Sequence, residues 1–104
     1  MHKKAILEMY LFFVKGSFNM KSFEYVIKDS EGIHARPAGA LVNLAKAFDD
    51  EITISKEGKQ ADAKRLFSVM GLCIKYDDKI TVSVQGETEE KAAAKLMEFF
   101  NNNL

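Results

Sequence analysis

Residues 32–39, Gly-Ile-His-Ala-Arg-Pro-Ala-Gly (GIHARPAG), mark the point at which the chain changes from one pattern of apolar residues to another. The stretch holds one of the two histidines and the only proline. A helix that begins here has Pro37 in its first turn, where the missing N–H costs no hydrogen bond and the φ angle is already helical. We therefore expect the joint between a strand and a helix at this stretch.

The patterns on the two sides of this stretch support that expectation. In residues 21–28 (KSFEYVIK), Phe23, Tyr25 and Ile27 alternate with their neighbours, which predicts a strand with one apolar face. The turn formers of residues 29–32 end it. From residue 35 to residue 48 the apolar residues follow helical spacing, and they form one stripe: Ala38, Leu41, Val42, Ala45 and Phe48.

The rest of the chain repeats this alternation of strands and helices. Residues 51–56 and 59–63 predict a hairpin around the turn Glu57-Gly58. A second helix is expected from residue 64 to about residue 74, with Phe67 at the margin of its inner stripe and partly exposed. The expected inner residues are Ile52 and Ile54 in the hairpin, and Leu66, Val69, Met70 and Cys73 in the helix.

The last two predicted elements are a strand and a helix. Ile80, Val82 and Val84 alternate in the strand, and Thr88 is expected to cap the helix. The buried stripe of this helix is Ala92, Ala93, Leu96, Phe99 and Phe100. The order strand, helix, strand, strand, helix, strand, helix predicts an α+β fold, with helices on one face of a small, mostly antiparallel sheet.

The composition restricts the class of protein. The 104 residues carry 15 basic and 15 acidic side chains, and this balance argues against a nonspecific nucleic-acid binder, which usually has a net basic face. The single cysteine, Cys73, cannot form an internal disulfide and has no second thiol for a metal, so we expect a reducing, cytoplasmic setting. We interpret Cys73 as a small core residue.

Residues 1–19 differ from the rest, with an apolar run from Ala5 to Val14 after two lysines. The run is too short to span a bilayer and has no good signal-peptidase site, so we expect no stable membrane insertion. We interpret residues 1–19 as an N-terminal extension and residues 20–104 as the domain. Residues 15–19 back-translate into a purine-rich tract typical of a ribosome-binding site, which favours a natural start at Met20. A docking helix and a membrane-surface anchor are the alternatives.

Residues 34–37 carry the most specific chemistry in the chain. A helix N-terminus has unpaired N–H groups and the positive end of the helix dipole, so it attracts anions. The same field disfavours the charged form of His34 and leaves a ring nitrogen available as a nucleophile. Arg36 can reach the oxygens of a phosphate with its fork of donors. This pattern indicates phosphoryl chemistry, whereas a histidine in isolation at this position would more often be a cap or a solvent-facing residue.

The chain resembles the HPr family, the histidine-containing phosphocarriers of the bacterial phosphoenolpyruvate-dependent sugar phosphotransferase system. The resemblance runs from residue 20 to residue 104, through GIHARPAGALV, ADAKRLFSVMGL and ITVSVQGETEEKAAAKL. It implies an open-faced sandwich of four antiparallel strands under three helices. It also implies that His34 is phosphorylated at Nδ1, that Arg36 steadies the phosphate and that Pro37 fixes the helix start.

The resemblance further implies that the protein is a carrier rather than an enzyme and needs no cofactor. Enzyme I would supply the phosphoryl group, and the IIA domains of sugar permeases would receive it. The residue after the histidine, Ala35, and the second helix would form the docking surface, with Leu66, Phe67 and Met70 as its apolar candidates.

The chain departs from the family at Arg65, which replaces a serine that a dedicated kinase phosphorylates in Gram-positive members. An arginine cannot accept that phosphate, so we expect no regulation of this kind. We interpret Arg65 as a solvated residue or a part of the docking face. Three alternatives remain open: a paralogue that regulates nitrogen or carbon use, an interaction module that is not phosphorylated, and a small nucleic-acid or ligand-binding domain.

Overall fold

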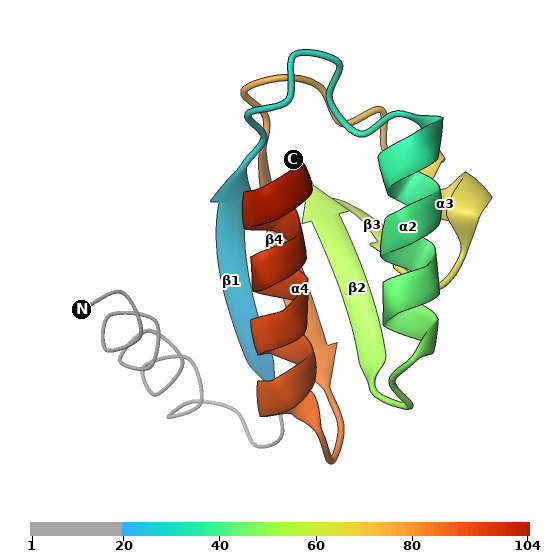
Figure 1. The fold of residues 1–104 in the computed structure, drawn as a ribbon, viewed down its shortest axis with the longest axis vertical. Helices are drawn as coiled ribbons and strands as arrows, with labels where there is room; N and C mark the ends of the chain where they lie inside the picture. The colour runs from blue at the N-terminus through green and yellow to red at the C-terminus, as the bar shows by residue number, and fades with distance from the viewer. Residues whose placement is uncertain (1–19) are drawn as a thin grey trace.

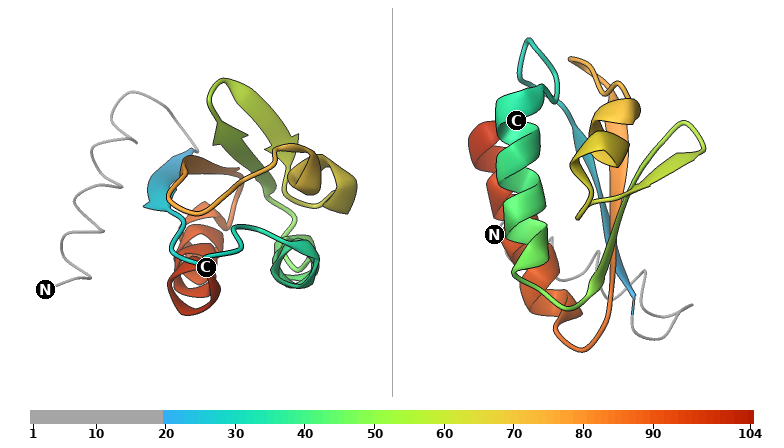
Figure 2. Two further views of the ribbon diagram at one scale, coloured as in Figure 1. Left: turned by 90° about the horizontal axis from the view of Figure 1, so that it is seen from above. Right: turned by 90° about the vertical axis from the view of Figure 1, so that its right-hand side faces the viewer.

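The computed structural model describes residues 20–104, so the expectations for residues 1–19 lie outside the described residues. In chain order, the strands and helices are β1 (Lys21–Val26), α2 (Ala35–Lys46), β2 (Glu51–Lys56), β3 (Lys59–Asp62), α3 (Leu66–Gly71), β4 (Lys79–Gln85) and α4 (Glu89–Asn103). The strands form one antiparallel sheet in the order β1-β4-β2-β3 (Figure 1). The helices α2 and α4 lie side by side on one face of this sheet, and α3 packs beside α2 and β3 (Figure 2). The predicted open-faced α+β sandwich is confirmed.

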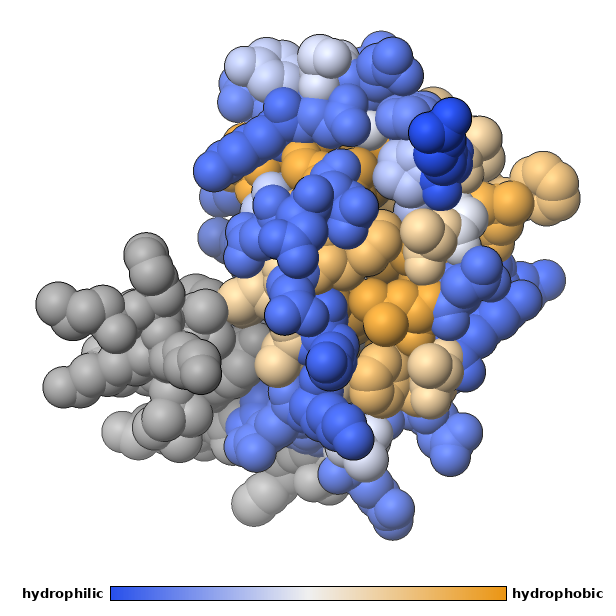
Figure 3. Space-filling model, viewed as in Figure 1, coloured by the Kyte–Doolittle hydropathy of each residue, from blue (hydrophilic) through white to orange (hydrophobic). Residues whose placement is uncertain are grey.

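The core lies between the sheet and the helices, and the alternating apolar residues of the strands form the sheet side of it. Phe23, Ile54 and Val82 are at most 1% exposed, whereas their polar neighbours face the open side of the sheet. On the helix side of the core, α2 contributes the predicted residues Ala38, Leu41, Val42 and Ala45. From the outside, an apolar band is visible between polar residues along the centre of this face (Figure 3).

The second helix is shorter than its sequence pattern predicts. It begins at Leu66 rather than at residue 64, because the Oδ1 of Asp62 accepts the N–H of Lys64 at 2.9 Å and a turn precedes the helix. It ends at Gly71, and Cys73 follows with a φ angle of 52°. The helical stripe therefore does not extend to Cys73, which is exposed. The expectation that Cys73 is a core residue is wrong, and Leu72 and Ile74 are buried in its place.

Three smaller expectations also need correction. The helix α2 ends at Lys46, so Phe48 lies beyond it and is half-buried, as is Phe99 in α4. Thr88 stands at the N-cap of α4, but its side chain does not cap the helix. Its hydroxyl and its N–H both donate to the carboxylate of Asp50, which is 3% exposed. The buried charge of Asp50 thereby gains the partners that it needs.

Candidate functional site

His34 lies at the end of the molecule where β1 leads into α2. It is the N-cap residue of α2, with an extended backbone (φ −98°, ψ −178°), and its carbonyl accepts the N–H of Ala38 at 2.9 Å. The imidazole forms no capping hydrogen bond, and its side chain is 40% exposed. The ring is therefore accessible at the positive end of a 12-residue helix.

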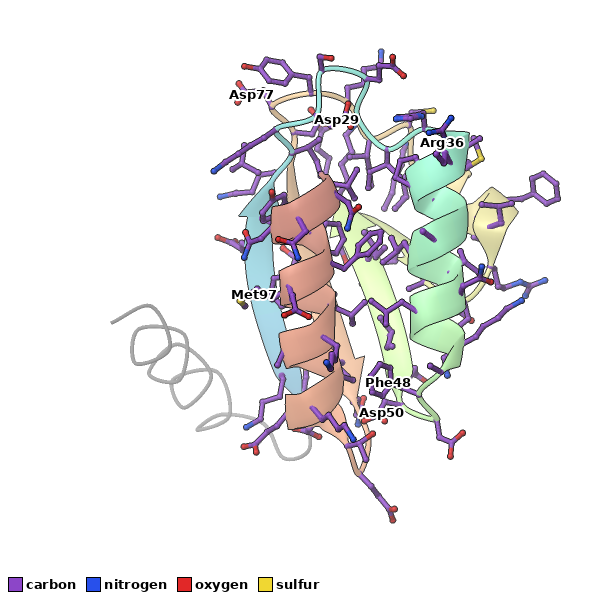
Figure 4. The ribbon with its side chains drawn as sticks, viewed as in Figure 1. Asp29, Arg36, Phe48, Asp50, Asp77 and Met97 are labelled. Carbon is purple, nitrogen blue, oxygen red and sulfur yellow. The ribbon has the colours of Figure 1, made fainter. Side chains whose placement is uncertain are left out.

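The next three residues form the first turn of α2. Ala35 and Arg36 are exposed, and Pro37 is half-buried in that turn, as the sequence predicts. Within residues 20–104 the Arg36 guanidinium forms no ion pair, so it is available for a ligand. Arg36 lies at the same end of the molecule as Asp29, whereas Phe48 and Asp50 lie at the opposite end (Figure 4).

Two carboxylates that the sequence pattern indicates only as turn formers lie beside the imidazole. The Nε2 of His34 is 3.6 Å from Oε1 of Glu31 and 3.9 Å from Oδ2 of Asp29. The Oδ1 of Asp29 also accepts the N–H of Glu31 at 2.8 Å, which shapes the turn. A neutral ring that keeps its proton on Nε2, toward these carboxylates, has its lone pair on Nδ1. In the sequence, the signal for this contact is that Glu31 and Asp29 stand three and five residues before His34.

The backbone before His34 is held by the segment between α3 and β4. Gly32 has a φ angle of 67°, and a Cβ at this position would lie 2.7 Å from Cα of Lys75 and closer still to the carbonyl oxygen of Ile74. The same carbonyl accepts the N–H of Ile33 at 3.1 Å. Only glycine fits this close approach, which fixes the direction in which the chain enters α2.

The predicted docking residues lie on and just before α3. Arg65 is the N-cap of α3 and is exposed, and Phe67 is 87% exposed, which confirms the predicted exposure of this ring. Met70 is 36% exposed, so the expectation that it is an inner residue is wrong, because α3 turns this side chain to the surface. Leu66 is half-buried and packs against the core. Because α3 packs against α2, these side chains belong to the helix next to the one that His34 starts.

An open-faced sandwich of four antiparallel strands and three helices is the fold of the solved histidine-containing phosphocarrier proteins that this chain resembles. The family described as "PTS HPr component phosphorylation site" matches residues 21–102. The chain belongs to this family, the HPr phosphocarriers of the phosphotransferase system, and the resemblance noted in the sequence is confirmed.

Individual relatives agree with the family. The chain is 38% identical to the phosphocarrier protein HPr of Borreliella burgdorferi over 79 residues, which cover 76% of this chain and 92% of that protein. It is 41% identical to that of Haemophilus influenzae over 78 residues, which cover 75% and 92%. The solved structure of a histidine-containing phosphocarrier protein from Mycoplasma superimposes with a TM-score of 0.76 at 32% identity, covering 78% of this chain and 92% of that one. Among residues 20–104, no helix combines the length and the hydropathy needed to cross a membrane.

Proposed function

We propose that this protein accepts a phosphoryl group on Nδ1 of His34 from phosphorylated Enzyme I and passes it to the IIA domains of sugar permeases. The observation that carries the proposal is the position of the His34 ring. It is exposed at the N-terminus of α2, and its Nε2 edge is turned toward Glu31 and Asp29.

The transfer is an in-line displacement at phosphorus. The lone pair of Nδ1 attacks as the bond from phosphorus to the donor nitrogen breaks, and the proton on Nε2 remains on the ring. Transfer to a IIA domain reverses these events, with the nitrogen of His34 as the leaving group. The protein is therefore modified and regenerated in each cycle and acts as a carrier rather than an enzyme.

The charges around the ring stabilise the phosphorylated form moderately. The positive end of α2 contributes about 0.3–1 kcal/mol to an exposed anion. A charge-assisted hydrogen bond from Arg36 adds about 1.5–3 kcal/mol. Pro37 fixes the start of the helix that supplies the first of these contributions. Contributions of this size hold a phosphoryl group without preventing its onward transfer.

The partners would dock on the surface formed by Ala35, Arg65, Leu66, Phe67 and Met70. Phe67 is the strongest anchor candidate, because a ring that is 87% exposed adds little to the core and much to an interface. A carrier must release each partner after transfer, so the interface should bury less than about 1,200 Å². We place this relay in the cytoplasm, where a lone reduced cysteine is the norm.

Labelling with radioactive phosphoenolpyruvate and Enzyme I tests the proposal. The wild type should become labelled with an adduct that is labile in acid and stable in base, and His34→Ala should remain unlabelled at equal stability. Labelling of His34→Ala would refute the proposal. An unlabelled wild type that still binds a regulator would instead favour the interaction module.

A second candidate is a regulatory member of the same family, which Arg65 favours because this residue cannot serve as the phosphorylated serine. Transfer rates to IIA domains from sugar permeases and from regulatory systems, measured with the same labelled protein, distinguish the two. Faster transfer to the sugar-specific domains would support the main proposal.

A further inference from the structure

The side chain of Lys56 connects the β2–β3 hairpin to the segment between α3 and β4. Its Nζ donates to the carbonyl oxygen of Cys73 and forms an ion pair with Oδ2 of Asp78, both at 2.8 Å. The same oxygen of Asp78 accepts the N–H of Lys75 at 2.8 Å. The Lys56 side chain is 15% exposed and that of Asp78 26%, so most of each side chain is covered by the fold.

The backbone of this segment is unfavourable without outside support. Cys73 and Asp77 both have left-handed φ angles, 52° and 71°, although neither is a glycine. Such conformations persist where the surrounding structure holds them. Lys56 binds a residue at each end of the stretch from Cys73 to Asp78 and is placed to provide that hold.

The opposite side of the same segment contacts the chain just before His34. The carbonyl of Ile74 accepts the N–H of Ile33, and the backbone of Ile74 and Lys75 lies directly against Gly32. Lys56 therefore binds the carbonyl of Cys73, and the carbonyl of the next residue, Ile74, binds Ile33. The path ends at the N-cap position of α2, where His34 stands.

We propose that Lys56 is a positioning residue for His34, acting through the Cys73 carbonyl and the Asp78 carboxylate on the segment that holds Gly32 and Ile33. The inference rests on the proposed function for its effect on phosphoryl transfer. Lys56 itself touches neither the imidazole nor the phosphate. By holding the segment it restricts the direction of the imidazole ring. A misplaced ring lowers the fraction of encounters in which Nδ1 is in line with the phosphorus–nitrogen bond that breaks.

The favourable charge environment of this pair agrees with the geometry. The hydrogen bond with Asp78 raises the pKa of Lys56, and the hydrogen bond from Lys56 lowers the pKa of Asp78. The pair is therefore fully charged at neutral pH, where transfer takes place. A neutral side chain of similar length at position 56 removes both contacts and leaves the segment without a side chain that connects it to the β2–β3 hairpin.

The test compares Lys56→Met with Lys56→Arg, which keeps the charge and donors, and with the matched control Lys59→Met. Lys59 is the cross-strand partner of Lys56 in the same hairpin and is exposed. Two quantities are measured: amide hydrogen exchange of Ile33 in the unphosphorylated protein, relative to the core residue Val82, and the maximal rate and KM of phosphorylation by Enzyme I.

For Lys56→Met we expect the Ile33 amide to exchange about tenfold faster relative to Val82, and the maximal rate to fall about tenfold at unchanged KM. Lys56→Arg should restore both values, and Lys59→Met should change neither. The proposal is overturned if Ile33 keeps its relative protection, if only KM changes, or if Ile33 and Val82 lose protection equally. A wild type that takes no label would refute the proposed function instead, and the exchange of Ile33 would still decide whether Lys56 holds this segment.

Discussion

The Nε2 of His34 lies 3.6 Å from Oε1 of Glu31, three residues earlier in the chain. The relationship distinguishes the two nitrogens of the ring, because a carboxylate at Nε2 favours the tautomer that is protonated there. The imidazole therefore lies near two opposite charges: the positive end of α2 and the negative carboxylate of Glu31. The proposed phosphorylation at Nδ1 therefore depends on a side chain that no pattern of apolar residues reveals.

Replacing Glu31 by glutamine should reduce the bias between the two tautomers. Exposed pairs of this kind contribute about 0.2–1 kcal/mol, so the phosphorylation rate should fall by no more than about fivefold. Nitrogen-15 chemical shifts of the His34 ring measure the tautomers, and labelling with phosphoenolpyruvate measures the rate. Glu31→Asp is the control that keeps the charge, and equal tautomer populations in wild type and Glu31→Gln would contradict the interpretation.

Arg36→Gln should weaken the phosphorylated state more than Arg36→Lys does. Glutamine loses the charge, whereas lysine keeps the charge and loses only the fork geometry. We expect the phosphorylation rate of Arg36→Gln to fall about tenfold, the lower end of what one charge-assisted hydrogen bond contributes. Circular dichroism should be unchanged in both variants, since Arg36 is exposed. Wild-type rates in Arg36→Gln would remove Arg36 from the site.

The two glycines in GIHARPAG should respond to alanine in opposite directions. Gly32→Ala forces a Cβ against Ile74 and Lys75 at a φ angle of 67°, and should lower the free energy of unfolding by more than about 1 kcal/mol. Gly39 is inside α2, and apart from its chain neighbours and the backbone of its own helix no atom lies within 4 Å of an added Cβ, so Gly39→Ala should raise the free energy of unfolding by about 0.5–1 kcal/mol. Urea denaturation of the two variants measures both changes, and a stabilising Gly32→Ala would show that the close approach is absent.

Phe67 and Val69 are two residues apart and should separate docking from stability. Phe67→Ser removes an exposed ring, so the free energy of unfolding should change by less than about 0.5 kcal/mol, while KM for Enzyme I rises about tenfold. Val69 is 1% exposed, and Val69→Ala should cost about 2 kcal/mol of stability. Its KM should stay at the wild-type value at temperatures where it is folded. A Phe67→Ser protein with unchanged KM would exclude this ring from the interface.

The Lys56–Asp78 pair gives stability a defined pH dependence. Pairing lowers the pKa of Asp78 from its ordinary 3.8, so this contribution is present above that value and is lost as the pH falls through the lowered pKa. Pairing raises the pKa of Lys56 from 10.5, so the contribution is present below 10.5 and is lost as the pH rises through the raised pKa. The difference in stability between wild type and Lys56→Met should therefore persist across neutral pH and shrink at strongly acidic pH, where the ion pair is lost and the hydrogen bond to the Cys73 carbonyl remains. Urea denaturation at pH 7 and pH 2 measures it, and a difference that grows toward pH 2 would contradict the assignment.

Local patterns were sufficient for the order of the elements and for the juxtaposition of the central residues of the candidate site. The alternation of Phe23 and Tyr25 in β1 and the spacing from Ala38 to Ala45 in α2 each reflect one face of one element. His34, Arg36 and Pro37 lie within four residues, so the helix start brings them together without any contact from distant parts of the chain. Such features follow from the chain's own geometry and can be predicted from neighbours in sequence.

Contacts between distant segments were decided by packing. Cys73 is exposed because α3 stops at Gly71, and Thr88 binds Asp50, 38 residues away, rather than its own helix. Lys56 binds Cys73 and Asp78, and Ile74 binds Ile33. These contacts connect three segments of the chain that no periodic pattern of apolar residues links. A side chain's partner across the fold depends on how the sheet and helices pack together. It therefore cannot be predicted from the residue's neighbours in the sequence.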